Sequence, residues 1–130
     1  MATGRTHRLI PSARLAPGEV LELTIGAEAA LAFRTPDGRC LVTAAHCPHM
    51  GNYMPNGLAP GEPLSRLLLH DQLLCPYHGW RFDGDGRCTG IPPGQRVPQK
   101  VQRGEPVLRH WQVREADGWI AVDLGDTAAE

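Results

Sequence analysis

The amino-acid sequence predicts an all-β fold, either a small barrel or a sandwich of short antiparallel strands. Three observations support this prediction. Short runs of apolar and β-branched residues recur along the chain, glycine (15 of 130 residues) and proline (12) separate them, and a helical apolar period is nearly absent. Short strands divided by frequent turn residues are typical of small barrels and sandwiches.

The N-terminal third is expected to form a meander of strands that ends close to Cys47. Turn residues separate the apolar runs, notably Ala16-Pro17-Gly18 and Thr35-Pro36-Asp37-Gly38, in which proline presets φ and glycine accepts a positive φ. The expected strands are residues 7–10, 20–25, 29–34 and 39–44. The last of these strands leads into Cys47.

The rest of the chain is expected to contain a loop and three further strand regions. Residues 52–63 are rich in glycine, proline and asparagine and predict a loop, whereas residues 64–69 fit a helical turn or the start of a strand equally well. The remaining expected elements are a strand at 71–74, a hairpin of 80–82 and 87–89 around Asp83-Gly84-Asp85-Gly86, an extended connector at 95–105, and a final hairpin of 107–114 and 119–124. We expect one domain over residues 1–130, with a core from about 7 to 124 and a frayed tail at 125–130.

Composition argues against several classes of function. A formal net charge of −1 does not favour binding to nucleic acids or to anionic membranes. No apolar run approaches the length of a membrane span, and residues 1–10 lack the apolar core of a secretory signal. We therefore expect a cytoplasmic protein whose four cysteines are available for metal binding rather than for disulfides.

Two short segments, each offering one thiolate and one imidazole, are the strongest functional signal. The first is Cys47-Pro48-His49-Met50-Gly51 and the second is Cys75-Pro76-Tyr77-His78-Gly79-Trp80. Two such pairs can hold a two-iron, two-sulfide cluster in which cysteines bind one iron and histidines the other. They can also hold a structural zinc ion, because the ligand set is the same. Zinc modules usually pair like ligands, so the mixed pairs favour the cluster.

The mixed ligand set has a consequence for electron affinity. With two ferric irons, two sulfides, two thiolates and two neutral imidazoles, the oxidised centre carries a formal charge of about zero, roughly two units less negative than a four-thiolate centre. The lower negative charge makes electron addition easier. The glycines that follow each histidine, Gly51 and Gly79, suit loops whose backbone must approach the sulfides closely.

The two segments and their flanks resemble the ligand boxes of Rieske iron–sulfur proteins. The second box, which continues into Trp80-Arg81-Phe82-Asp83, is especially similar to that of Rieske non-haem iron oxygenases. Ile91-Pro92-Pro93 resembles the third loop that covers the cluster in this family. The resemblance implies that Cys47 and Cys75 bind the inner iron and that His49 and His78 bind the outer iron. It also implies that the cluster is surrounded by Met50, Gly51, Tyr77, Gly79, Trp80 and Pro92.

Two departures from the family pattern are informative. The respiratory branch of the family has an extra cysteine in each box, whereas residues such as Asn52 and Tyr77 occupy those places here, so the resemblance points to the oxygenase-linked branch. The gap between the boxes is longer than usual, and residues 52–63 are expected to form an insertion near the cluster.

The expected function is one-electron transfer through a Rieske cluster in a ring-hydroxylating or similar non-haem iron oxygenase system. The chain fits either a free-standing ferredoxin or the Rieske domain of an oxygenase. Its expected partners are an electron-donating reductase and a catalytic oxygenase subunit or domain, because the remaining histidines do not group with a carboxylate into a second iron site. The alternative is a zinc-stabilised interaction module. The spare cysteines, Cys40 and Cys88, are interpreted as buried strand residues.

Overall fold

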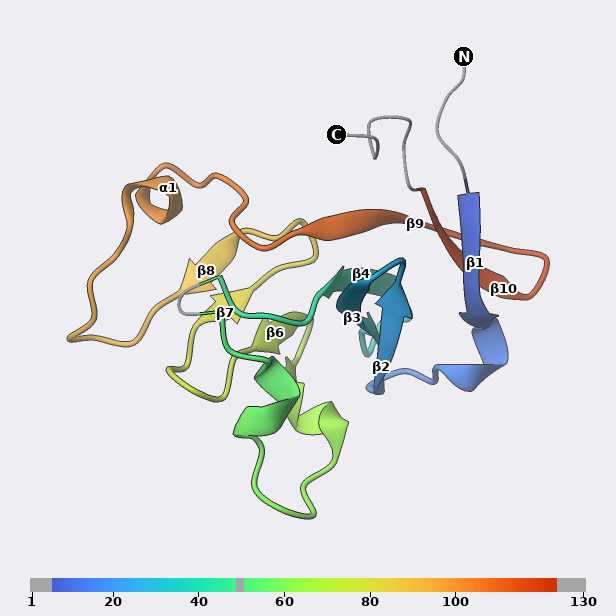
Figure 1. Cartoon of the computed structure of the whole chain (residues 1–130), viewed down its shortest axis with the longest axis horizontal. Coiled ribbons are helices and arrows are strands. Elements are labelled where there is room, and N and C mark those ends of the chain that lie inside the picture. The colour runs from blue at the N-terminus through green and yellow to red at the C-terminus, as the bar shows by residue number, and fades with distance from the viewer. Residues whose placement is uncertain (1–5, 49–50, 124–130) are drawn as a thin grey trace.

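The structure is a computed structural model that describes residues 6–48 and 51–123. A six-stranded antiparallel sheet, curled on itself, has the strand order β1-β10-β9-β4-β3-β2 (Figure 1). Its strands are β1 (Thr6–Pro11), β2 (Val20–Ile25), β3 (Glu28–Arg34), β4 (Cys40–Ala44), β9 (His110–Ala116) and β10 (Trp119–Asp123). The prediction of an all-β, antiparallel fold is confirmed.

The apolar runs of the sequence explain which strands are central. Residues 30–33 of β3 are completely buried, because β3 lies between β2 and β4 and both of its faces are covered. By contrast, β2 has an alternating pattern in which only its first and last residues are fully buried. The register Val20↔Phe33 to Ile25↔Glu28 has no bulge, as expected for two strands joined by a tight turn.

Arg34, at the end of β3, is the main buried cation in the larger sheet. Its guanidinium group donates hydrogen bonds to the carbonyl oxygens of Leu15 (2.6 Å) and Gly38 (2.9 Å) and pairs with both carboxylate oxygens of Glu115 on β9 (2.7 and 3.1 Å). A bidentate pair of this kind restricts both side chains. Arg34 therefore ties two turns and a distant strand to the end of β3.

A second, four-stranded sheet has the order β5-β6-β7-β8 and lies beside the first (Figure 1). Its short strands are β5 (Leu68–Leu69), β6 (Gln72–Leu74), β7 (Arg81–Phe82) and β8 (Cys88–Gly90). The segment that joins β6 to β7 is the second Cys/His box. Leu73 and Phe82, paired across β6 and β7, are fully buried and fix both ends of that segment in the core.

The hairpin turn between β7 and β8 joins the two sheets. The carbonyl oxygen of Gly86 accepts hydrogen bonds from the backbone N–H groups of Val107 (2.9 Å) and Leu108 (3.0 Å), just before β9 begins. The Asp-Gly-Asp-Gly turn that the sequence predicts thus has a tertiary role, since it holds the small sheet against the large one.

Some segments that connect the strands differ from the predictions. Residues 64–69 contain both alternatives, a 3-10 turn η3 (Leu64–Leu67) followed by β5. The connector at 95–105 is not extended throughout, because it includes the helical turn α1 (Gln99–Gln102), and the final hairpin begins at His110 rather than at residue 107. The other short turns are η1 (Ser12–Arg14) and η2 (Met54–Gly57). The expected frayed tail lies outside the described residues.

Within residues 6–48 and 51–123, no helix has the length and apolarity needed to cross a membrane.

Candidate metal centre

The first box is a tight loop closed by two backbone hydrogen bonds around Cys47. The N–H of Cys47 donates to the carbonyl oxygen of Asn52 (2.8 Å), and the carbonyl oxygen of Cys47 accepts from the N–H of Gly51 (2.7 Å). Gly51 has φ +75°. His49 and Met50, which the sequence predicts as a ligand and a neighbour of the cluster, lie outside the described residues.

The second box repeats this pattern residue for residue. The N–H of Cys75 donates to the carbonyl oxygen of Trp80 (2.8 Å), and the carbonyl oxygen of Cys75 accepts from the N–H of Gly79 (2.9 Å), which has φ +80°. The backbone of each cysteine is thus hydrogen-bonded to the fourth and fifth residues after it. This is an α-turn that is closed by a glycine in the left-handed region. Glycine reaches that region at little cost, which explains its presence after each histidine.

The two loops bring their cysteines together in the core. Cys47 and Cys75 are 2% and 0% exposed and form no disulfide. The thiol of Cys47 donates a hydrogen bond to the sulfur of Cys75, and the backbone N–H groups of Tyr77 and His78 also donate to it, which together lower the pKa of Cys75 to about 6 against the effect of burial. Hydrogen bonds that stabilise a thiolate are what a metal-binding sulfur requires.

The other two cysteines have the opposite character. Burial raises the pKa of Cys40 to about 11, and burial also raises the pKa of Cys88. Both lie in strands, as expected, but in separate sheets and half-buried rather than buried. The structure thus brings Cys47 and Cys75 together in the two matching loops and keeps Cys40 and Cys88 apart from each other.

The histidine side of the second box faces solvent. His78 and Tyr77 are both exposed, Tyr77 to 41%, whereas Cys75, two residues earlier, is completely buried. A centre held by these loops would therefore have its sulfur ligands in the core and an imidazole ligand at the surface. This polarity agrees with the inner and outer irons that the family resemblance implies.

A segment from the small sheet's far end covers the second box. We call residues 91–98 the cover segment. A Cβ atom placed on Gly79 would lie 2.8 Å from Cγ of Pro92, so the proline ring rests directly on the glycine. Three residues later, the side chain of Gln95 is hydrogen-bonded to the indole of Trp80 and to the backbone of His78. The sequence gives no signal for Gln95, since a glutamine in a polar connector has no distinctive pattern.

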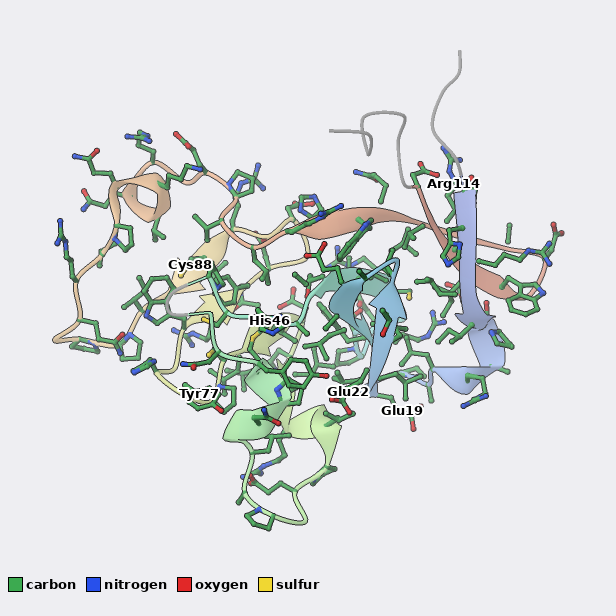
Figure 2. The ribbon with its side chains drawn as sticks, in the orientation of Figure 1. Glu19, Glu22, His46, Tyr77, Cys88 and Arg114 are labelled. Carbon is green, nitrogen blue, oxygen red and sulfur yellow. The ribbon has the colours of Figure 1, made fainter. Side chains whose placement is uncertain are left out.

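The insertion at 52–63 packs against the same box. A Cβ atom placed on Gly57 in η2 would lie 2.6 Å from Cγ of Pro76 and 3.0 Å from the ring of Tyr77. Figure 2 shows Tyr77 beside this segment. Tyr53 fixes the start of the insertion, because its hydroxyl donates a 2.5 Å hydrogen bond to Glu22 on β2 and its ring contacts that of His46. These contacts place the segment against the second box, and its expected position near the cluster stays a prediction.

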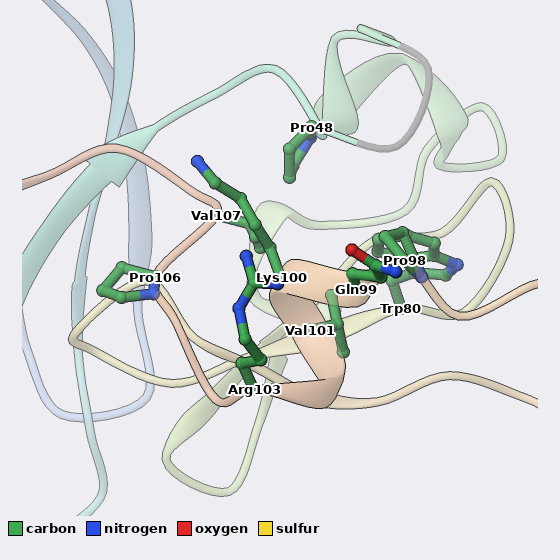
Figure 3. Close-up of a pocket in the computed structure, with 9 residues that line it drawn as sticks. All are labelled: Pro48, Trp80, Pro98, Gln99, Lys100, Val101, Arg103, Pro106 and Val107. Carbon is green, nitrogen blue, oxygen red and sulfur yellow. The ribbon is translucent and has the colours of Figure 1, made fainter.

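A pocket of about 510 Å³ lies beside the first box (Figure 3). Pro48 and Trp80, one from each box, form part of its wall, and the helical turn α1 contributes Lys100 and Val101. Arg103 lies at the same wall, where its guanidinium group pairs with Glu105 at 2.7 Å. The pocket combines apolar walls with cationic side chains.

These features fit a two-iron, two-sulfide cluster. The donor set comprises two contacting thiols, an exposed imidazole and loop amides directed at sulfur, which are the groups that such a cluster uses. In the part of the chain that the structure describes, no three His, Cys, Asp or Glu side chains gather closely enough to hold one metal ion.

The fold and the paired loops define the protein as an iron–sulfur electron-transfer domain. The family model described as "Rieske [2Fe-2S] domain" matches residues 6–102. The chain therefore belongs to the Rieske [2Fe-2S] domain family.

Relatives and solved structures agree with this assignment. The chain is 37% identical over 115 residues to cholesterol 7-desaturase nvd 1 of Ciona intestinalis, covering 88% of this chain and 22% of the relative. It is 33% identical over 90 residues to the oxygenase component of 3-ketosteroid-9-alpha-monooxygenase of Rhodococcus rhodochrous, covering 69% and 20%. Dicamba monooxygenase is a structural neighbour with TM-score 0.74 and 27% identity, covering 98% of this chain and 35% of that one.

Family membership establishes the cofactor class and the basic function. The cofactor is a Rieske-type 2Fe-2S cluster, which supplies one-electron transfer, and none of these comparisons supports a zinc-stabilised interaction module. The chain spans about one fifth of the length of the curated relatives named above.

Proposed function

We propose that this chain is the Rieske domain of a non-haem iron oxygenase system, in which Cys47, Cys75, His49 and His78 ligate the cluster. The repeated hydrogen-bond pattern around Cys47 and Cys75 is the observation that carries the ligand assignment. Two loops with the same internal hydrogen bonds can each direct a cysteine sulfur at one cluster that they share. The oxygenase setting is supported by the relatives, which are named as oxygenase components and sterol desaturases.

The exposure of the second box indicates where electrons enter and leave the protein. An electron crosses a protein surface most easily where the cofactor's ligand reaches solvent, and His78 and Tyr77 supply such a site. Val97 in the cover segment is a further exposed apolar residue (37%), and Arg96 and Lys100 add positive charge. We assign this face to contact with an electron-donating reductase and with the catalytic oxygenase part.

Three further points belong to this proposal. The chain folds as one domain, because the hairpin turn at Gly86 joins the two sheets through backbone hydrogen bonds. It works in the cytoplasm, where a reducing environment keeps its four cysteines free. The catalytic partner acts on a steroid-class substrate, as the names of the desaturase and monooxygenase relatives indicate for those proteins.

Metal analysis and cysteine substitution test the ligand assignment. The purified protein is expected to contain two irons and two acid-labile sulfides per chain and, after reduction, to give a Rieske-type EPR signal. Cys47→Ser and Cys75→Ser should each abolish iron binding. The matched variants Cys40→Ser and Cys88→Ser should retain both irons and the signal. A colourless protein with one zinc, or loss of the cluster in Cys40→Ser, would refute the proposal.

A further inference from the structure

The side-chain amide of Gln95 connects two residues of the second box. Its Oε1 accepts a 2.8 Å hydrogen bond from Nε1 of Trp80, and its Nε2 donates a 2.8 Å hydrogen bond to the carbonyl oxygen of His78. An indole N–H can only donate and a backbone carbonyl can only accept. The two partners therefore fix the orientation of the amide, and neither a carboxylate nor an apolar side chain of similar size can satisfy both of them.

The carbonyl that Gln95 binds belongs to a peptide group that is held at its other end as well. The carbonyl of His78 and the N–H of Gly79 form a single planar unit. That N–H donates a 2.9 Å hydrogen bond to the carbonyl oxygen of Cys75. One end of the plane is thus tied to the core cysteine and the other end to the cover segment, so the plane cannot rotate without breaking one of the two bonds.

The position of this peptide group determines the position of the imidazole. The same residue carries the bound carbonyl and the side chain that the proposed function assigns to the outer iron. Pro92 adds a second attachment, because its ring lies where a Cβ of Gly79 would be. Gln95 and Pro92 together hold the cover segment over the loop that bears His78.

We propose that Gln95 is a positioning residue that sets the orientation of His78 and limits how much water passes the exposed imidazole to reach the cluster. This inference rests on the proposed function, since it requires that His78 be a ligand. Gln95 itself touches the backbone of the ligand loop and the neighbouring indole. It acts on the cluster through them.

Two variants separate the contributions of the two hydrogen bonds. Gln95→Leu removes both, and Gln95→Glu keeps an acceptor for Trp80 but loses the donor to His78. For Gln95→Leu we expect altered g-values in the EPR spectrum of the reduced protein and a reduction potential shifted upward, because added water stabilises the more negative, reduced centre. Release of iron to a chelator should be roughly ten-fold faster, since the cover segment opens more often when its two hydrogen bonds to the second box are lost.

Gln102→Leu is the matched control. Nε2 of Gln102 donates a 2.9 Å hydrogen bond to the carbonyl oxygen of Val97, so this variant also removes a glutamine bond to the cover segment, although no contact with the box is involved. Its g-values, potential and chelation rate should stay at the wild-type values. Equal changes in Gln102→Leu would overturn the proposal, because general loosening of the segment would then explain them.

The other possible outcomes also support or overturn the proposed role of Gln95. Wild-type values of all three readouts in Gln95→Leu would overturn the proposal. If Gln95→Leu does not assemble the cluster, wild-type g-values in Gln95→Glu would overturn it, and altered g-values with intact iron content would support it. Absence of a Rieske signal in the wild-type protein, measured first, would instead refute the proposed function.

Discussion

Three glycines with almost the same φ provide a graded test of how the two sheets and the cover segment are held. Gly118, Gly79 and Gly86 have φ values of +80°, +80° and +79°. An alanine at each position meets the same backbone strain, about 1–2 kcal/mol for the left-handed region. Differences among the three alanine variants therefore report on what surrounds the added methyl group.

The distance from an added Cβ atom to its nearest neighbour decreases in the order Gly118, Gly79, Gly86. A Cβ atom on Gly118 would have nothing within 4 Å, one on Gly79 would lie 2.8 Å from Cγ of Pro92, and one on Gly86 would lie 2.0 Å from the carbonyl oxygen of Leu108. Gly118→Ala should therefore cost the strain alone. Gly79→Ala adds an overpacking cost of about 1–3 kcal/mol against the ring of Pro92, which can move only together with the cover segment. Gly86→Ala should cost most, because its obstacle is backbone at the junction of the two sheets.

Thermal unfolding followed by circular dichroism measures the series. For a chain of this length, 1 kcal/mol corresponds to a shift of about 3–6 °C in the midpoint. Gly118→Ala should lower the midpoint by about 3–12 °C, Gly79→Ala by more, and Gly86→Ala by the most or to the point that no folded protein accumulates. Iron release should be faster in Gly79→Ala than in Gly118→Ala. Equal midpoints in all three variants would refute the assigned contacts.

Two further predictions concern charge. His78→Cys, and likewise His49→Cys, should lower the reduction potential if the cluster assembles, because a thiolate adds negative charge at the outer iron; a raised potential would contradict the assignment. Arg34→Met should lower the free energy of unfolding by about 3 kcal/mol, whereas Arg114→Met, which breaks an exposed pair with Asp123, should cost much less. The hydrogen bond from Arg34 lowers the pKa of Glu115 in the folded protein. The stabilisation by this pair is therefore present above the unfolded-state pKa of the carboxyl group and is lost as the pH falls through the folded-state pKa. When the free energy of unfolding is measured against pH, wild type should lose stability more steeply in acid than Arg34→Met.

Local features of the sequence were sufficient to predict most strands. The expected strand at 20–25 matches β2 at both ends, and 29–34 misses β3 by one residue, because alternating or continuous apolar runs ended by Pro-Gly and Asp-Gly turns leave little freedom. The two boxes could also be predicted from the sequence, because a thiol, an imidazole and a following glycine within five residues constrain the loop that can form.

The contacts that hold the boxes in place could not be predicted in this way. Gln95 is seventeen residues from His78, and Gly57 is nineteen residues from Pro76, so no local periodicity connects them. The helical turn α1 was missed for a related reason. Its four residues follow Pro98, and they carry no apolar pattern of their own. Such features depend on tertiary packing, which single-sequence patterns do not contain.

The second box is held from two segments, and this changes how the long insertion should be understood. Gly57 packs against Pro76 and Tyr77, at the start of the loop, while Pro92 and Gln95 act on its end. A close-packed contact transmits displacement, because neither the proline rings nor the peptide planes between them can be compressed. A larger residue at position 57 would therefore move Pro76, and with it the loop that carries His78. The insertion is thus part of the support of the exposed histidine, and its sequence can adjust the face that the proposed function assigns to a redox partner.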